Sequence, residues 1–471
     1  VSLNNLVFPI YLEKYFFITK IMFEIKNTTK WIKWSNFVYL IENKKWLNQL
    51  DFLELDKKII SKIEETISEK KSKKINFFLW NKDFENLIIF FYTKEDKKSL
   101  VDFISKEFKV LDKNFTFSSQ DDKNISVLLK SCLLSRYSFN TYKTEKIEDE
   151  IYFFINKTSN NEAESTYNLV KNIILARDLW ETPASDLTPE AFAKLVKATK
   201  FKNTKIKILS PKQVEKKWLG LLWGVWKAAT AKPYVVILER IIDKKLPTIW
   251  VVWKWVTFDT GWIQVKPGDH MYEMKWDMCG AATVFATMKE LDNKDLNVNI
   301  VAALGLAENG IAGDGYKPSD ILTAYNKKTV DIIHTDAEWR LVMADVMSYL
   351  SDKYNLDRLM TVATLTWACM MALGFRYAGV MWSDEEIIKK LLKNSEKSEE
   401  KYCRLPYDNY FIEKTKSEIA DIENLNRWVY AGSTMWAAFL SNFLDNNELY
   451  THLDIAGTAL NSFEAYWYTN K

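Results

Sequence analysis

The stretch WVVWKWVTFDTGWIQVKP, from Trp250 to Pro267, decides the fold of this chain. Its first part is rich in valine and other apolar residues, which predicts a buried strand, and its second part has the polar residues and glycine of a tight loop. Lys254, Asp259 and Lys266 stand along the strand end and the loop. Charges at the ends of buried strands are where α/β proteins build their sites. The tryptophans are unexpected here, because tight loops favour small residues.

Three further segments are predicted to form buried strands, with helices between them. They are YVVILE (234–239), VNIVAALGL (298–306) and LMTVATLT (359–366). Buried strands that alternate with helices are typical of a sheet covered on both faces. We therefore expect residues 161–471 to form a C-terminal α/β domain with a central mixed sheet flanked by helices.

A smaller α/β domain is predicted for residues 22–160. Short strand-like runs such as INFFLW (75–80) and NLIIFFYT (86–93) alternate there with helical stretches. The polar segment 156–166 is predicted to connect the two domains. Residues 1–21 are predicted to be an extension without a structural role, with translation beginning near Met22.

The composition is that of a globular protein without strong charge bias. The chain has 471 residues, of which 48% are hydrophobic and 27% charged, and a formal net charge of +3. It is long enough for two domains, and its charge gives no global case for a nucleic-acid partner. No window reaches the roughly 18 apolar residues of a membrane helix, and the N-terminus lacks the features of a signal peptide. We expect a cytoplasmic protein with no membrane partner.

Cysteine and histidine are too scarce for the metal sites that these residues usually build. The four cysteines are widely spaced, and there are three histidines in the whole chain. This argues against a disulfide framework and against a thiolate or histidine-rich zinc site. Any bound metal would be held mainly by carboxylates.

Four carboxylates at predicted strand ends and helix starts are candidates for such binding. They are Asp259, Asp277, Asp336 and Glu338. Gathered in one cleft they would repel one another, and divalent cations are the usual compensation. A carboxylate that bridges two ions gives a centre that activates water, and a nearby lysine can stabilise an oxyanion. Singly, Asp277 is also interpretable as a helix cap, the lysines as surface residues, and Asp336 with Glu338 as an acidic first helical turn.

Together these segments resemble the leucyl aminopeptidase family. The family pattern reads Gly-Lys-Gly-hydrophobic-Thr-Phe-Asp-Ser-Gly-Gly, a lysine shortly after it, Met-Lys-x-Asp-Met-x-Gly-Ala-Ala, and Asn-Thr-Asp-Ala-Glu-Gly-Arg-Leu. This chain has WKWVTFDTGW (253–262), Lys266, MKWDMCGAA (274–282) and HTDAEWRL (334–341). The resemblance implies that residues 161–471 form a metallo-aminopeptidase catalytic domain and that the N-terminal domain is macro-like.

The resemblance also implies two divalent ions in each subunit, either zinc, manganese or magnesium. Carried over position by position, Lys254, Asp259, Asp277 and Glu338 would bind one ion. Asp259, Asp336 and Glu338 would bind the other, so that Asp259 and Glu338 bridge the two.

Two further site residues follow from the same resemblance. Lys266 would contact the tetrahedral intermediate, and Arg340 would hold bicarbonate or an equivalent base, with the backbone of Leu365 beside it. The implied substrates are peptides with a free N-terminus, leucine-like residues being preferred, and the implied assembly is a homohexamer.

Tryptophan stands where the family has glycine. The positions are Trp253, Trp255, Trp262, Trp339 and Trp367, with Trp180, Trp226, Trp382 and Trp428 as further candidates. Glycine usually makes up about 7% of residues, and the 13 glycines reach that share only together with the 19 tryptophans. We therefore expect that UGA codons which the source organism reads as glycine are written as tryptophan in this sequence.

Two rival functions fit parts of the sequence. A catalytically impaired family member could serve as a hexameric scaffold or a DNA-binding protein, but the ligand residues are intact and the net charge is near zero. A phosphate or nucleotide binder would need a glycine-rich loop, and neither Gly-x-x-x-x-Gly-Lys-Ser/Thr nor Gly-x-Gly-x-x-Gly occurs.

Overall fold

The computed structural model describes most of the second half of the chain and parts of the first. The described residues are 35–41, 61, 74–78, 84–91, 115–118, 122–135, 137–144, 153–154, 160–354, 356–364, 366–395, 400–426, 430–444 and 448–459. Among them no helix is long and apolar enough to cross a bilayer. The predicted extension 1–21, Leu365 and Trp428 lie outside the described residues. The chain divides into two units, with the boundary between Ile174 and Leu175.

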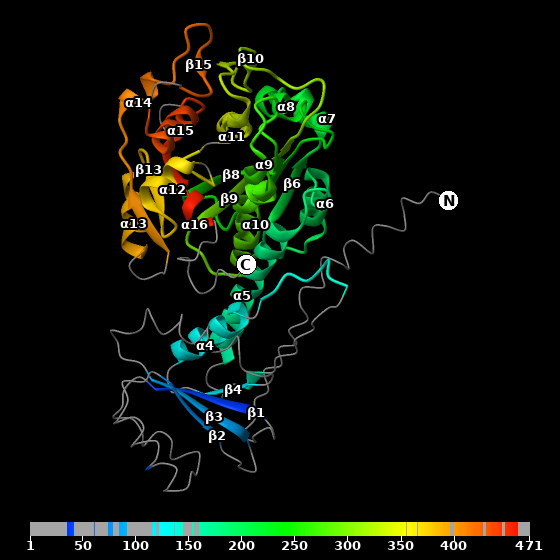
Figure 1. The fold of residues 1–471 in the computed structure, drawn as a ribbon. Helices are drawn as coiled ribbons and strands as arrows, with labels where there is room; N and C mark the ends of the chain where they lie inside the picture. Colours follow the sequence, from blue (N-terminus) through cyan, green and yellow to red (C-terminus); the bar gives the residue numbers. More distant parts are fainter. Residues whose placement is uncertain are drawn as a thin grey trace. The chain divides into compact units, whose positions relative to one another are not determined.

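The N-terminal unit contains a five-stranded mixed sheet in the order β2-β3-β1-β4-β5 (Figure 1). Its strands are β1 (Ser35–Ile41), β2 (Lys74–Phe78), β3 (Phe84–Phe91), β4 (Phe115–Ser118) and β5 (Phe153–Phe154). Strand β1 is parallel to β3 and β4, whereas β2 is antiparallel to β3. The strands predicted at 75–80 and 86–93 correspond to β2 and β3. Helix α4 (Asp122–Ser135) follows β4.

Helix α5 (Asn160–Glu181) spans the boundary between the units. It begins inside the polar segment 156–166, which is therefore helical from Asn160 onward. Ala163 and Thr166 are buried, and the Thr166 hydroxyl lies 2.7 Å from Oγ of Ser126 on α4. Packing of the face that carries Ala163 and Thr166 stabilises the helical conformation of this polar segment.

An eight-stranded mixed sheet lies at the centre of the second unit, in the order β14-β13-β16-β12-β8-β9-β7-β6. The strands are β6 (Lys205–Leu209), β7 (Tyr234–Arg240), β8 (Thr248–Asp259), β9 (Asn299–Asn309), β12 (Arg358–Ala363), β13 (Tyr377–Met381), β14 (Lys401–Arg404) and β16 (Leu449–Asp454). The central strands β16, β12, β8 and β9 are parallel, and β7 and β6 continue the sheet antiparallel.

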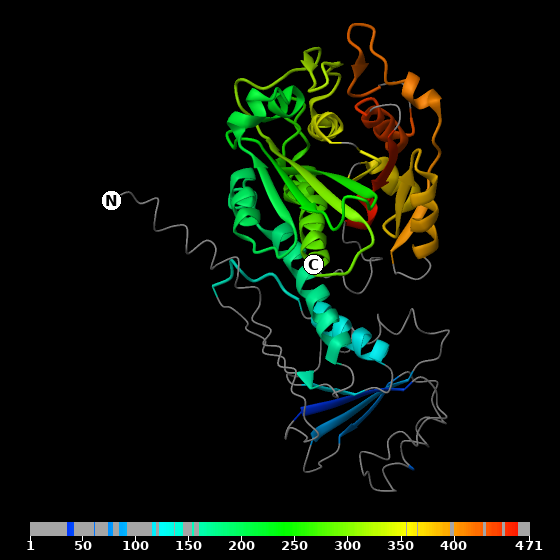
Figure 2. The ribbon, with the colours of Figure 1, turned by 180° about the vertical axis from the view of Figure 1, so that it is seen from behind.

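Helices cover both faces of this sheet (Figures 1 and 2). On one face lie α6 (Pro189–Ala198), α10 (Cys279–Leu291) and α13 (Glu385–Ser395). On the other lie α8 (Gly220–Trp226), α11 (Glu338–Lys353) and α15 (Gly432–Ser441). Each set contributes to a separate apolar core. The predicted α/β class, with a central mixed sheet flanked by helices, is confirmed.

Short elements complete the second unit. They are α7 (Pro211–Lys216), α9 (Gly268–Met271), η5 (Tyr272–Met278), β10 (Ile321–Thr323), β11 (Thr329–Asp331), η6 (Thr335–Ala337), α12 (Trp367–Leu373), α14 (Asn409–Glu413), β15 (Ile422–Glu423) and α16 (Ala456–Ala459). Strands β10, β11 and β15 form a small sheet of their own. The turns η5 and η6 lead directly into α10 and α11.

Alternation along β8 sorts its side chains between the two cores. Trp250 and Val252 pack with the α8, α11 and α15 side, whereas Trp253 and Trp255 pack with the α6 and α10 side. Because strand side chains alternate, Lys254 points toward α11. Pairing with β9 shifts by one residue between Val256 and Asp259. Such a bulge re-aims the residue that follows it, and it brings Asp259 to the same side as Lys254.

Tryptophan occupies left-handed backbone at three places. Among the described residues six that are not glycine have positive φ, and three of these are Trp218 (+60°), Trp262 (+56°) and Trp382 (+100°). Trp218 follows α7: its N–H donates to the carbonyl of Glu215, and the next N–H, of Leu219, donates to that of Val214. This is the Schellman ending of a helix, in which glycine is strongly preferred at the left-handed position.

This backbone predicts that glycine is the better residue at position 218. We expect Trp218→Gly to be more stable than Trp218→Ala by about 1 kcal/mol, because a Cβ is strained in left-handed backbone. The indole is 57% exposed, and both variants lose it equally. The shift in the midpoint of thermal unfolding measures the difference.

Trp223, inside α8, provides the matched control. There alanine should be more stable than glycine by about 1 kcal/mol, as in any helix interior. Equal or higher stability of Trp218→Ala over Trp218→Gly would contradict the prediction.

Candidate active site

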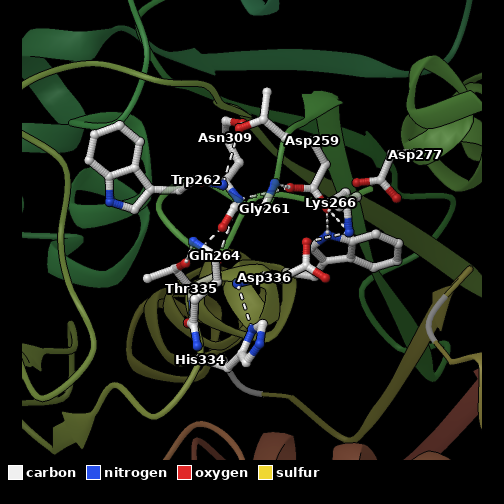
Figure 3. A network of polar contacts seen from close by, with 12 residues as sticks. Asp259, Gly261, Trp262, Gln264, Lys266, Asp277, Asn309, His334, Thr335 and Asp336 are labelled. Atoms are coloured by element: carbon white, nitrogen blue, oxygen red, sulfur yellow. Dashed lines mark hydrogen bonds and ion pairs between the residues drawn. The ribbon is translucent and has the colours of Figure 1, made fainter. Parts of the chain in front are cut away.

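Asp259 is held in place at the end of β8 by donors from the following loop and from β9. Its Oδ1 accepts hydrogen bonds from the N–H of Gly261 (2.9 Å) and from Nδ2 of Asn309 (2.8 Å). Gly261 has a φ of +78°, which lets the chain turn back tightly on Asp259. Oδ2 of Asp259 lies 2.9 Å from Nζ of Lys266, which returns on the far side of the turn (Figure 3).

Asp336 and Glu338 come from the start of α11. Asp336 lies in η6, and Glu338 is the first residue of the helix. Thr335 ties this start to the β8 loop, because its hydroxyl donates to the carbonyl of Gly261 (2.7 Å). Nδ1 of His334 accepts the N–H of Asp336 (3.2 Å), and Figure 3 shows the imidazole turned away from the carboxylates. His334 therefore supports the backbone of this segment.

Three carboxylates form a group that can hold a metal ion. Asp259, Asp336 and Glu338 each offer one oxygen, and these oxygens lie within 4.8 Å of one another. Glu338 is fully buried, and neither of its carboxylate oxygens has a hydrogen-bond partner in the described part of the chain. A buried carboxylate without partners is costly, and a bound cation would remove this cost. The residues present fit a divalent ion with oxygen ligands.

Lys254 and Asp277 lie beside this group. Lys254 is buried in β8, with Nζ 2.5 Å from Oδ1 of Asp277. Asp277 belongs to η5 and does not cap α10, whose N-cap residue is Met278. Oδ2 of Asp277 has no hydrogen-bond partner among the residues described. The predicted metal ligands and the predicted catalytic lysine are thus neighbours in space: Lys254, Asp259, Lys266, Asp277, Asp336 and Glu338.

Burial and like charge shift the pKa values of this cluster. Burial raises the pKa of Glu338 well above its ordinary value, and the charge of Asp259 adds to the shift. Burial and Asp259 likewise raise the pKa of Asp336 to about 6. Burial lowers the pKa of Lys254 to about 7. For Lys266 burial acts downward, but Asp259 and its neighbouring carboxylates outweigh it and raise the pKa. The carboxylates therefore favour a positive charge among them.

Arg340 lies on α11, two residues beyond Glu338, and is buried. One guanidinium nitrogen donates to the carbonyl of Asn424, and the group lies 3.2 Å from the ring centroid of Trp436. Its Nε has no hydrogen-bond partner in the described residues. Burial lowers the pKa of Arg340, while the charge of Glu338 acts in the opposite direction. The predicted companion of Arg340, Leu365, lies outside the described residues.

The tryptophans predicted to replace glycine have different surroundings. Trp253 and Trp255 are buried on the α6 and α10 side of β8. The side chain of Trp262 is buried but points away from the carboxylates (Figure 3). Trp367 begins α12 and is 61% exposed. Trp339 is the exception, since its indole lies among the predicted ligands.

The residues that support the site were not predicted from the sequence. Asn309 fixes Asp259, and Gln264 accepts the N–H of Thr335 (2.7 Å). The Tyr316 hydroxyl donates to the carbonyl of Thr335 (2.6 Å). Only Asn309 carried a signal: it follows the predicted buried strand 298–306 by three residues, and the carboxyl ends of parallel strands meet at one edge of a sheet.

Comparisons with known proteins identify the family to which this chain is similar. Residues 174–470 match the family model described as the cytosol aminopeptidase family, catalytic domain. A probable cytosol aminopeptidase of Cenarchaeum symbiosum is 34% identical over 341 residues, which cover 71% of this chain and 70% of that protein. One of Fusobacterium nucleatum is 34% identical over 362 residues, covering 76% and 75%.

Solved structures show the same fold. The cytosol aminopeptidase of Coxiella burnetii superposes with a TM-score of 0.78 at 25% identity, covering 92% of this chain and 93% of that one. The bottromycin maturation enzyme BotP in complex with Mn has a TM-score of 0.78 at 22% identity, covering 92% and 95%. As its sequence motifs predict, the chain belongs to the cytosol aminopeptidase family and is a hydrolase of the leucyl aminopeptidase type.

Proposed function

We propose that the chain removes N-terminal residues from peptides at the group formed by Asp259, Asp336 and Glu338. The observation that carries this proposal is the pair of buried, unpartnered oxygens of Glu338 beside two other carboxylates. Divalent ions at this place would polarise the scissile carbonyl and activate water. The structure of BotP with Mn, which shares the fold, supports a divalent ion of this kind.

Two ions are proposed, and either zinc, manganese or magnesium suits them. Lys254, Asp259, Asp277 and Glu338 would hold one ion, and Asp259, Asp336 and Glu338 the other. The carboxylate group supports the second set, because it offers three oxygens without rearrangement of the backbone. In the first set Lys254 must act as a neutral amine, for which its burial provides the setting.

Lys266 and Arg340 have separate proposed tasks. The side chain of Lys266 is 14% exposed at the rim of the carboxylates, so its ammonium can reach a substrate and stabilise a developing oxyanion. Arg340 is proposed to hold bicarbonate or another base that moves a proton, and its Nε is available to an anion within the described surroundings. Leu365 is proposed to lie beside that anion.

The remaining properties are proposed from the family alone. They are a preference for leucine-like N-termini, a homohexameric assembly and a cytoplasmic location. A free N-terminal amine on one of the ions would explain why a single residue is removed. The rival role, a non-catalytic scaffold or DNA-binding protein, gains no support from the relatives, which are named as aminopeptidases.

Activity should depend on a metal ion and on which residue stands at the positions where the family has glycine. We expect a form with glycine at positions 253, 255, 262, 339 and 367 to release p-nitroaniline from leucine p-nitroanilide with Mn²⁺ or Zn²⁺, and to lose this activity with a chelator. The form with tryptophan should be much less active, because an indole lies among the ligands. Initial rates of both purified forms measure the difference.

Glu338→Gln in the glycine form tests the carboxylate group itself. It should lower kcat/KM by at least about 100-fold, because it removes a ligand charge. Asp352→Asn, at an exposed position of the same helix, is the matched control and should be neutral. Absence of metal-dependent release by the glycine form would refute the aminopeptidase proposal.

Lys266→Met should separate catalysis from metal binding. We expect kcat to fall by about 10² to 10³, as for loss of an oxyanion donor, while bound Mn²⁺ stays the same or increases because a competing cation is gone. Steady-state kinetics and metal content measure the two effects. Lys207→Met removes an exposed lysine paired with Glu239 and should change neither. Unchanged kcat in Lys266→Met would exclude the proposed role.

A further inference from the structure

The indole of Trp339 lies between the two groups of predicted ligands. Trp339 follows Glu338 in the first turn of α11. Its Nε1 donates to Oδ2 of Asp259 (3.2 Å), and Nζ of Lys254 lies against the face of its ring. The ring also meets that of Trp436 edge-on, with the centroids 6.3 Å apart. The indole is therefore held from several directions.

The groups around this indole are those that would hold an ion. Oδ1 of Asp277 lies 2.5 Å from Nζ of Lys254, and its Oδ2 has no hydrogen-bond partner in the described part of the chain. The Glu338 oxygens are unpartnered within the same limits. Buried acceptors without donors are costly unless a cation approaches them. An aromatic ring in their midst supplies one N–H and a face that attracts the lysine ammonium, but no charge.

The other carboxylate group is less obstructed. Asp259, Asp336 and Glu338 keep three oxygens within 4.8 Å of one another, and Lys266 provides their present counter-charge. A bound divalent ion would take the place of that ammonium. The two groups therefore differ in whether they can hold an ion. Asp259, Asp336 and Glu338 can hold one, whereas the indole of Trp339 occupies the space beside Lys254 and Asp277.

We propose that Trp339 sets the number of ions that the chain binds. With tryptophan at this position, one divalent ion binds through Asp259, Asp336 and Glu338, and the indole excludes a second from Lys254 and Asp277. This inference rests on the proposed metal centre, but it concerns stoichiometry rather than turnover.

Equilibrium dialysis against Mn²⁺ alone, followed by elemental analysis, tests the proposal. The chain with tryptophan at position 339 should bind one manganese ion, and Trp339→Gly should bind two. Adding Asp277→Asn to Trp339→Gly should return the value to one, because the second place loses a ligand. Trp262→Gly is the matched control: its indole points away from the carboxylates, and the value should remain one.

Trp339→Ala separates loss of the indole from destabilisation of the helix by glycine, because alanine favours the first turn of α11 more than glycine does. It should also bind two manganese ions. Two manganese ions bound to the unchanged chain would overturn the proposal. It would also be overturned if Trp339→Gly and Trp339→Ala bound no more manganese than the unchanged chain. A rise to two ions without peptide hydrolysis would support the role of Trp339 while refuting the proposed activity.

A second inference rests on the backbone rather than on the site. Trp218, Trp262 and Trp382 all have positive φ, and Trp382, at +100°, lies beyond the region that side chains other than glycine usually enter. Trp218 stands outside the motifs that resemble the family, yet it occupies the glycine position of a Schellman ending. We infer that the source organism places glycine at all three positions, as expected if UGA is read as glycine.

Tandem mass spectrometry of the protein purified from its source organism tests this inference. Peptides that cover positions 218, 262 and 382 should have the residue mass of glycine at each. The residue mass of tryptophan at any of the three would overturn it. Position 218 is the most informative, because no family pattern suggested it.

Discussion

The structure of the catalytic unit depends on one constraint, which is the burial of like charges. Asp259, Asp277 and Glu338 are almost fully withdrawn from water, and Asp336 lies beside them. Lys254 and Lys266 are the cations that pair with them. Burial penalises every charge in such a cluster, and the carboxylates repel one another, so their pKa values rise. A divalent ion bound among these carboxylates would compensate them with more charge than one lysine ammonium supplies.

A β-bulge in β8 and the turn at Gly261 bring the carboxylates close together. A regular β8 would place Asp259 on the α6 and α10 face, opposite Lys254, and the bulge against β9 reverses this. The turn at Gly261 then brings Lys266 back to Asp259, and the Thr335 hydroxyl joins the turn to the start of α11. A helix start also suits acidic residues, because free N–H groups and the helix dipole are found there. The cluster therefore depends on the β8 loop and the start of α11, which hydrogen bonds hold together, and on η5, whose Asp277 pairs with Lys254.

Much of this arrangement was predictable from the sequence, and the reasons are local. The strands at 234–239 and 298–306 were found because they are almost entirely apolar, and the start of α11 because Asp336 and Glu338 are typical of an acidic first helical turn. The carboxylates were found because their motifs are specific. The bulge and the roles of Asn309 and Tyr316 were not predictable, since they arise from pairing between segments distant in sequence. The helix that begins at Asn160 was not predictable from its polar composition, because its start depends on the burial of Ala163 and Thr166.

The tryptophans show why side-chain direction matters more than side-chain size. Trp253 and Trp255 flank Lys254 in sequence but face the opposite side of the sheet, where they pack against α6 and α10. The turn at Gly261 directs Trp262 outward from the carboxylates (Figure 3). Trp339 differs because its indole donates to Asp259 and lies against Lys254, so it occupies space beside the carboxylates. A chain can therefore keep the fold of this family and all of the proposed ligands, while one bulky residue at a helix start occupies the space between them.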